Sequence, residues 1–157
     1  MSTILAVGNE YEYSMKAGAT IRTSTAQYKV GYIEDEETFD TIGSTATART
    51  AFGVNQSEMS ANSIVCLVRR YGLSKVICGG SVTAGQYVVA YEGVSTTTHY
   101  GSIQQVGANG TPITAATASV SAQHTVLGVA IENGQTDQAI YIDLNPQLYD
   151  QCLLAAT

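Results

Sequence analysis

The side chains that could bind a metal ion or act as catalytic base and nucleophile are few in this chain of 157 residues. The two histidines and three cysteines are widely dispersed, at His99, His124, Cys66, Cys78 and Cys152. A zinc site needs clustered cysteine and histidine ligands, and an odd number of cysteines without close spacing argues against a disulfide framework. We therefore expect no metal site among these residues.

Nucleotide-binding and nucleophile motifs are also missing from the sequence. It contains neither a phosphate-binding P-loop nor the glycine fingerprint of dinucleotide-binding folds. The nearest serine motif, at residues 79–83 (Gly-Gly-Ser-Val-Thr), lacks the closing glycine of the hydrolase nucleophile elbow. A tertiary contact between a histidine and a serine or cysteine stays open at this point. We predict a protein that is not an enzyme and that needs no cofactor.

One cluster of carboxylates, Glu34-Asp35-Glu36-Glu37 with Asp40 nearby, offers the oxygen ligands that calcium prefers. The cluster lacks the alternating spacing and the central glycine of an EF-hand loop. We interpret it as a solvated, self-repelling loop rather than as a calcium site.

Composition and charge narrow the class of partner. The net charge is −6, charged residues make up only 13% of the chain, and 45% of the residues are hydrophobic. Because the basic residues form no patch, we expect no nucleic-acid partner. All of them fall before Val76: Lys16, Arg22, Lys29, Arg49, Arg69, Arg70 and Lys75. Few charges and many short side chains suit a surface that lies against other protein, although strand propensity also favours threonine.

No apolar run reaches the length of a membrane span, and the N-terminus lacks the basic and apolar regions of a secretory signal. We therefore expect a protein that is made in the cytoplasm and does not contact a membrane.

The elements that must position any site are predicted to be β-strands. Strand-like runs occur at 64–68, 76–78 and 86–91. The runs 125–131 and 139–144 flank an Asn-Gly turn, which predicts a hairpin with a loop longer than two residues. Helix periodicity is poor in most of the chain. We predict an all-β fold, either a β-sandwich or a small β-barrel.

The two ends are predicted to differ from the body. Residues 1–14 are expected to form an extended N-terminal arm, with an ordinary edge strand as the alternative, and residues 15–157 a single β domain. Near the C-terminus, Pro146 suits the first turn of a helix, and apolar residues follow at a spacing of four. We predict a short helix or docking tail over residues 146–154.

A short pattern occurs twice in the same order, which predicts a domain built from two related halves, about 15–75 and 82–145. The first copy consists of Ala17-Gly18, Gly53-Val54 and the apolar run 64–68, and the second of Ala84-Gly85, Gly128-Val129 and residues 140–142.

The chain has ten tyrosines and no tryptophan. A tyrosine at a protein–protein contact buries a large apolar ring while its hydroxyl stays hydrogen-bonded. An aromatic platform for a sugar would use the same residue type, with Tyr87, Tyr91 and Tyr100 as candidates.

In the second copy, Ala84-Gly85-Gln86-Tyr87-Val88 begins a predicted strand, and residues 125–133 (Thr-Val-Leu-Gly-Val-Ala-Ile-Glu-Asn) lead into the short strand 139–142. This order resembles the small head-decoration, or capsid cement, proteins of tailed bacteriophages. The resemblance covers roughly the second half of the chain, with a fainter echo in the first half.

The resemblance implies a non-enzymatic structural protein of the virion, which binds the major capsid protein on the outer capsid surface and stabilises the shell. It further implies a homo-oligomer, either a dimer or a trimer, and an N-terminal arm that reaches a neighbouring subunit. The residues expected to contact the capsid are Ile4, Leu5, Val7, Tyr11 and Tyr13. The doubled unit and the long insertion at 34–50 depart from the simplest family members and leave the docking geometry open.

Two other kinds of function stay open on the sequence. One is a carbohydrate- or receptor-binding β module on a virion surface. The other is a different virion part, such as a tail-tube or head-fibre protein, which would form rings or fibres.

Overall fold

The computed structural model describes residues 2–5, 10–43, 50–91, 99, 101–106 and 123–150. Within these residues the chain forms ten β-strands and no α-helix, which confirms the all-β class. The strands are β1 (Ser2–Leu5), β2 (Glu10–Ala17), β3 (Val30–Asp35), β4 (Thr38–Thr41), β5 (Gly53–Asn55), β6 (Val65–Ile77), β7 (Tyr87–Ala90), β8 (Ile103–Gln105), β9 (Gln123–Ala130) and β10 (Ala139–Asp150).

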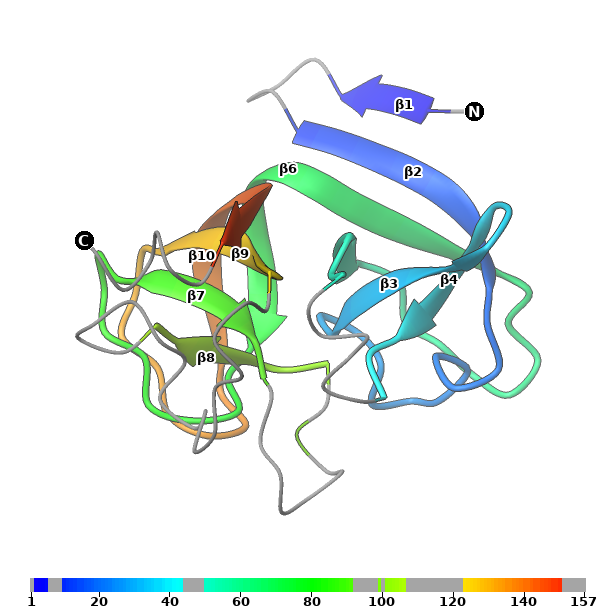
Figure 1. The fold of residues 1–157 in the computed structure, drawn as a ribbon. Helices are drawn as coiled ribbons and strands as arrows, with labels where there is room; N and C mark the ends of the chain where they lie inside the picture. The colour runs from blue at the N-terminus through cyan, green and yellow to red at the C-terminus, as the bar shows by residue number, and fades with distance from the viewer. Residues whose placement is uncertain are drawn as a thin grey trace.

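Five of these strands close a small barrel (Figure 1). The strands β2, β4, β3, β5 and β6 are neighbours in that order, and β6 returns to pair with β2 along Glu12–Lys16 and Val65–Arg69. The β2–β4 pair is parallel, whereas the other pairs of the barrel are antiparallel. The barrel is therefore the correct one of the two predicted architectures.

Strand β6 links the barrel to a second group of strands. Its first part pairs with β2 and β5, and its last part pairs with β10, from Gly72↔Leu144 to Ile77↔Ala139. Gly72 has a φ of 91°, a conformation that suits glycine and lets the strand bend where it changes partners. The two runs predicted as separate strands at 64–68 and 76–78 are thus the two ends of one strand, which Figure 1 shows passing between the two groups.

The strands beyond β6 form what we call the outer sheet: the last part of β6, then β10, β9, β7 and β8. An isolated bridge between Cys78 and Ile103 connects β8 back to the residue that follows β6. Burial alternates along β10, where Ile140 and Ile142 are buried and Tyr141 is exposed, as expected for a strand with one face on the core.

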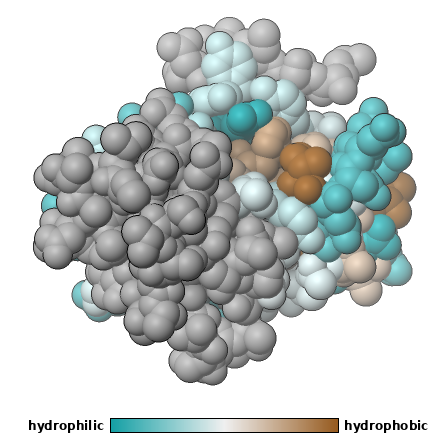
Figure 2. All heavy atoms as spheres, viewed as in Figure 1, coloured by the Kyte–Doolittle hydropathy of each residue, from teal (hydrophilic) through white to brown (hydrophobic). Residues whose placement is uncertain are grey.

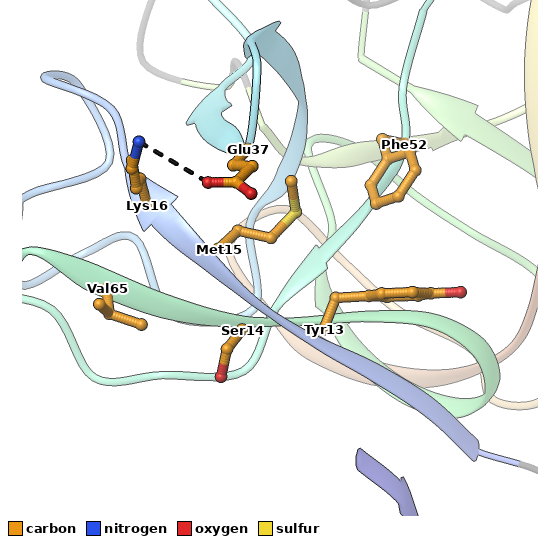
Figure 3. Close-up of a pocket in the computed structure, with 7 residues that line it drawn as sticks. All are labelled: Tyr13, Ser14, Met15, Lys16, Glu37, Phe52 and Val65. Atoms are coloured by element: carbon orange, nitrogen blue, oxygen red, sulfur yellow. Dashed lines mark ion pairs between the residues drawn. The ribbon is translucent and has the colours of Figure 1, made fainter. Parts of the chain in front are cut away.

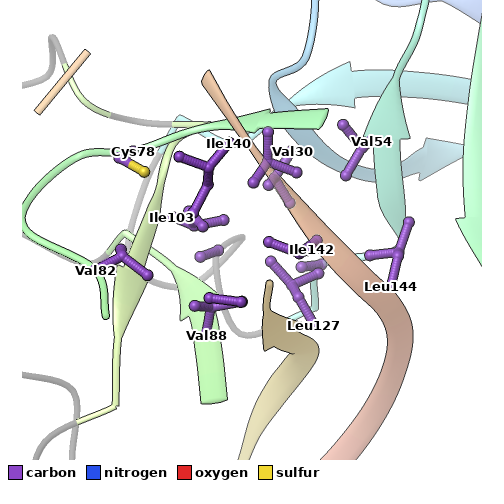
Figure 4. Close-up of a cluster of buried hydrophobic side chains, with 14 of the residues drawn as sticks. Val30, Val54, Cys78, Val82, Val88, Ile103, Leu127, Ile140, Ile142 and Leu144 are labelled. Carbon is purple, nitrogen blue, oxygen red and sulfur yellow. The ribbon is translucent and has the colours of Figure 1, made fainter. Parts of the chain in front are cut away.

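Two main clusters of buried apolar side chains hold the described part of the molecule together, beside a third that contains only Val89, Val106 and Val126. The smaller of the two main clusters lies with the barrel strands and contains Ala17, Ile21, Ala26, Phe39, Met59, Cys66 and Val68. The larger cluster joins Val30 and Val54 of the barrel to Ile140 and Leu144 of the outer sheet (Figure 4). The barrel and the outer sheet therefore share one core, and burial of these side chains is the main stabilising contribution.

The hairpin predicted around residues 133–134 is confirmed, since β9 and β10 are antiparallel neighbours joined by residues 131–138. The C-terminal helix predicted from Pro146 is wrong over the residues described, because β10 continues as a strand to Asp150. Pro146 falls in a register shift between Leu144 and Gln147, and such a bulge tolerates the missing N–H of proline. The rest of the predicted helix, residues 151–154, lies outside the described residues.

The two Ala-Gly steps of the sequence pattern lie in different settings. Ala17 is the last residue of β2, and the Gly18 N–H donates to the carbonyl of Phe39 at 2.9 Å. Gly85 precedes β7 in a turn and has a φ of 83°. These two steps are therefore not structurally equivalent.

Candidate interaction surface

The N-terminal strand is the outermost element on the barrel side. Strand β1 lies at the end of the strand order and pairs antiparallel with β2, from Ser2↔Tyr13 to Leu5↔Glu10 (Figure 1). Among the strands described, β2 is its only partner, so the other edge of β1 is open to a further strand. Two of the expected contact residues, Ile4 and Leu5, belong to β1, and Val7 lies outside the described residues.

The two tyrosines of the predicted arm lie in β2, within the barrel wall. Tyr11 is 40% exposed and its ring meets that of Tyr71 edge-on at 5.7 Å between centroids. Tyr13 is half-buried, with its ring centroid 6.0 Å from that of Phe52. An arm able to move away from the barrel without opening β2 would therefore comprise residues 1–9 rather than 1–14.

A buried ion pair fixes this part of β2 to β6. The carboxylate of Glu12 accepts hydrogen bonds from Nε and Nη2 of Arg69, and the Glu12 side chain is only 6% exposed. Arg69 also donates through Nη1 to the carbonyl of Leu73 at 2.5 Å. The pair joins residues far apart in the sequence, and no local pattern in the chain indicates it.

Beside this wall lies a hollow of about 390 Å³, lined by Tyr13, Ser14, Met15, Lys16, Glu37, Phe52 and Val65 (Figure 3). An exposed ion pair between Lys16 Nζ and Glu37 Oε2, 3.7 Å apart, lies at its rim. Val65 at the hollow and Ile64 next to it are 53% and 71% exposed. The hollow combines apolar side chains with charges at its rim, an arrangement suited to holding an apolar side chain of a partner.

The exposed surface of the described residues is mixed in character. On the face shown in Figure 2, hydrophilic residues surround a small hydrophobic area on the part of the surface that is coloured. The carboxylates of residues 34–37 are exposed at the end of β3 and in the turn that leads to β4. Asp40 is instead buried, and its carboxylate accepts hydrogen bonds from the backbone N–H groups of Thr20, Ile21 and Thr41. Asp40 therefore stabilises the loop at residues 20–21 through these hydrogen bonds, and its carboxylate is not free to bind calcium together with the acidic cluster.

The described histidine meets a carboxylate rather than a nucleophile. Nδ1 of His99 lies 3.6 Å from Oδ1 of Asp137, and its ring packs edge-on against Tyr91 at 5.5 Å. The other histidine, His124, is in β9, and its side chain lies outside the described part.

A lysine and a serine form a hydrogen bond close to this histidine. Nζ of Lys29 donates to Oγ of Ser102 at 2.8 Å, and burial lowers the pKa of Lys29 while nearby Asp137 opposes that shift. Ser102 is completely buried, so a substrate cannot reach its hydroxyl. The hydrogen bond is best explained as a structural contact between the barrel and the outer sheet. Lys29 and Ser102 are too far apart in the sequence for a motif search to connect them.

The two described cysteines are free and buried. Burial raises the pKa of each thiol to about 11, which keeps both protonated at neutral pH and makes them poor nucleophiles. Among the described residues there is no group of three or more His, Cys, Asp or Glu side chains placed to hold a metal ion. No helix in the described part could cross a membrane.

The sugar-platform candidates do not form one surface that the structure describes. Tyr87 is 55% exposed on β7, Tyr91 is half-buried against His99, and Tyr100 lies outside the described residues.

Comparison with known proteins identifies no relative of this chain: no protein-family model matches it, and no curated protein matches it.

Proposed function

We propose that this chain is a capsid decoration protein of a tailed bacteriophage, a structural part of the virion that binds the major capsid protein on the outer capsid surface. The motif resemblance in the second half of the chain supports this function, and the partner follows from it. The proposal includes no catalytic step.

The observation that carries the proposal is the open edge of β1 next to the hollow. A free edge strand can add to a sheet of another protein through main-chain hydrogen bonds, while neighbouring pockets accept side chains. Here the strand lies at one end of the sheet, and the hollow lies by the same strand, β2, with which β1 pairs. We expect the capsid subunit to engage Ile4, Leu5 and Val7 together with the exposed ring of Tyr11.

We further propose that the chain contains two related halves, in a register that differs from the one the Ala-Gly steps suggested. The N–H of Gly18 donates to Phe39 of β4, and the N–H of Gly79 donates to Ile103 of β8 in the same manner. Gly79, rather than Gly85, would thus be the equivalent of Gly18.

The strand pairings support the same register. In the first half Cys66 of β6 pairs with Met15, three residues before Gly18. In the second half Ile140 of β10 pairs with Val76, three residues before Gly79. Gly53-Val54 belongs to β5, between β3 and β6, and Gly128-Val129 belongs to β9, between β7 and β10. On this proposal the first half begins in β2 and the second begins in the last part of β6, so that one chain offers two similar bodies to neighbouring capsid subunits. Two linked contacts strengthen binding through effective concentration.

The test is cosedimentation of the purified protein with capsids of its source phage, with bound copies counted per particle. We expect full occupancy for the intact chain and its loss when residues 1–9 are deleted. A length-matched variant in which Ile4, Leu5 and Val7 are replaced by serine separates side-chain from main-chain recognition. Circular dichroism and thermal unfolding of each variant check that the barrel is intact.

Three results would count against the proposal. Failure of the intact chain to bind capsids refutes the decoration role. Full occupancy by the chain lacking residues 1–9 refutes docking through the N-terminal strand. Assembly into rings or fibres, or clear binding on a glycan array without capsid binding, favours one of the alternative virion functions.

A further inference from the structure

Arg70 is the extra residue of a β-bulge in β6. Tyr71 lies opposite Tyr11 of β2, and Arg69 lies opposite Glu12, so no residue of β2 lies opposite Arg70. A bulge of this kind inserts one residue into a strand and redirects its side chain out of the regular alternation. The direction of the Arg70 side chain is therefore set by a local departure from regular strand geometry.

The guanidinium of Arg70 lies against aromatic rings. Its central carbon is 4.3 Å from the centre of the Phe52 ring and 5.5 Å from that of the Tyr71 ring. The negative face of an aromatic ring attracts a guanidinium at such distances. The cation is thus held in place before any partner binds.

The same rings connect the hollow to the N-terminal strand. Phe52 lines the hollow together with Tyr13, whose ring centroid lies 6.0 Å from that of Phe52 (Figure 3). Tyr71 meets Tyr11 edge-on, and Tyr11 belongs to the part of β2 that pairs with β1. Because Arg70 contacts both Phe52 and Tyr71, it lies between the hollow and the strands β1 and β2.

Arg70 donates no hydrogen bond to any residue that the structure describes. Its Nε is buried and has no hydrogen-bond partner. The carboxylates on this side of the barrel are already engaged, that of Glu12 by Arg69 and that of Glu37 by Lys16. A buried donor without an acceptor destabilises a folded protein, and each such group in a native structure needs an explanation. We therefore expect the anion that Arg70 lacks to come from another molecule.

We propose that Arg70 binds a carboxylate of the protein segment that docks beside β1. This inference rests on the proposed docking of a capsid segment, and it assigns to that segment an aspartate or glutamate flanked by apolar residues. A guanidinium binds both oxygens of a carboxylate at once, and the hollow beside Phe52 accepts an apolar side chain of the same segment. The net charge of −6 opposes a polyphosphate partner, so we assign the anion to a protein side chain.

The first test needs no capsid. The Nε–Hε signals of the nitrogen-labelled full chain are followed by NMR while the blocked tripeptide acetyl-Leu-Glu-Leu-amide is added, with acetyl-Leu-Gln-Leu-amide as the uncharged match. We expect a saturable shift of the Arg70 signal with the glutamate peptide and none with the glutamine peptide. The Arg69 signal is the internal control, because its guanidinium already binds Glu12. Arg70→Lys, which lacks the Arg70 signal, assigns it.

The second test compares capsid affinity with the stability of the free chain. Arg70→Met keeps an unbranched side chain against Phe52 but removes the donors, so we expect an affinity for capsids at least about tenfold lower and a Tm that is unchanged or higher. A role confined to packing on Phe52 would instead lower Tm and leave capsid affinity unchanged. Lys75→Met is the matched control, because it removes the same charge from the part of β6 that pairs with β10 and should bind capsids as the intact chain does.

Three results would overturn the inference: equal shifts of the Arg70 signal with the two peptides, an equal shift of the Arg69 signal, or capsid binding by Arg70→Met as tight as that of the intact chain. If the intact chain binds no capsid, the decoration role fails instead. The peptide titration then decides by itself whether Arg70 recognises a carboxylate.

Discussion

Removal of the Glu12 carboxylate should destabilise the barrel strongly. Glu12 and Arg69 retain only 6% and 17% of their side-chain exposure, and the carboxylate accepts two hydrogen bonds from the guanidinium. Breaking such a pair leaves a charge poorly solvated and costs about 3–5 kcal/mol. Because Arg69 is partly exposed and keeps its bond to the carbonyl of Leu73, we expect a loss of about 3 kcal/mol for Glu12→Ala.

This loss is large compared with the whole stability of a domain of this size. Native domains are stable by about 5–15 kcal/mol, and for a chain of this length each 1 kcal/mol corresponds to about 2–4 °C in Tm. Glu12→Ala should therefore lower Tm by about 6–12 °C. Urea unfolding followed by circular dichroism measures the change in the free energy of unfolding directly.

Two control variants separate the ion pair from other effects. Glu37→Ala removes a carboxylate that pairs with Lys16 at 3.7 Å but is 80% exposed, so its effect should lie within the error of the measurement. Replacing both Glu12 and Arg69 by methionine leaves no unpaired charge and should recover most of the loss. A loss below about 1 kcal/mol for Glu12→Ala, or a double variant as unstable as the single one, would refute our assignment of Glu12 to the barrel wall.

Two further predictions concern backbone packing and the thiols. Gly128→Ala should destabilise the outer sheet by roughly 3 kcal/mol or more, because Gly128 has a φ of 154° and an added Cβ would lie 1.9 Å from the carbonyl oxygen of Asp143. Gly80→Ala, with nothing within 4 Å of its added Cβ, should change the urea midpoint little, and equal effects for the two would contradict this explanation. The thiols of Cys66 and Cys78, whose pKa values rise from 9.0 to about 11 on folding, stabilise the protein below pH 9, and this stabilisation should be lost as the pH rises towards 11. Urea midpoints across that pH range, with thiol labelling that appears only on unfolding, test it in a Cys152→Ser background.

The strands with a clear two-residue period were predictable from sequence. Along residues 139–144 the aliphatic residues Ile140, Ile142 and Leu144 recur at every second position, and the structure buries them while exposing the residues between them. The same rule missed the continuity of β6, because Arg69, Arg70 and Gly72 interrupt its apolar pattern where the strand passes from the barrel to the outer sheet. Period-two reasoning detects one buried face and fails where the burial fades, as it does over residues 69–72, although even-numbered residues of β6 are buried both before and after that stretch.

The C-terminal prediction failed for a different reason. A spacing of four between apolar residues and a proline at the first turn are typical of a helix, but they are local signals. Strand β9 supplies backbone partners up to Asp150, and the bulge at Pro146 removes the need for the missing N–H. Tertiary pairing thus outweighed local preference, and the sequence contains no signal of how far β9 extends.

The candidate surfaces depend on register, which composition and spacing do not specify. Glu12 meets Arg69 and Leu73 aligns with Tyr87 only because five strands pair with particular neighbours. The consequence for the N-terminal segment is specific. The alternation at residues 11–15 was compatible with either a free arm or an edge strand, and the ion pair of Glu12 places that stretch in the barrel wall. A deletion of residues 1–14 would therefore lose stability and capsid binding together, whereas a deletion of residues 1–9 removes the open edge and leaves the barrel closed, so only the shorter deletion can attribute lost binding to docking.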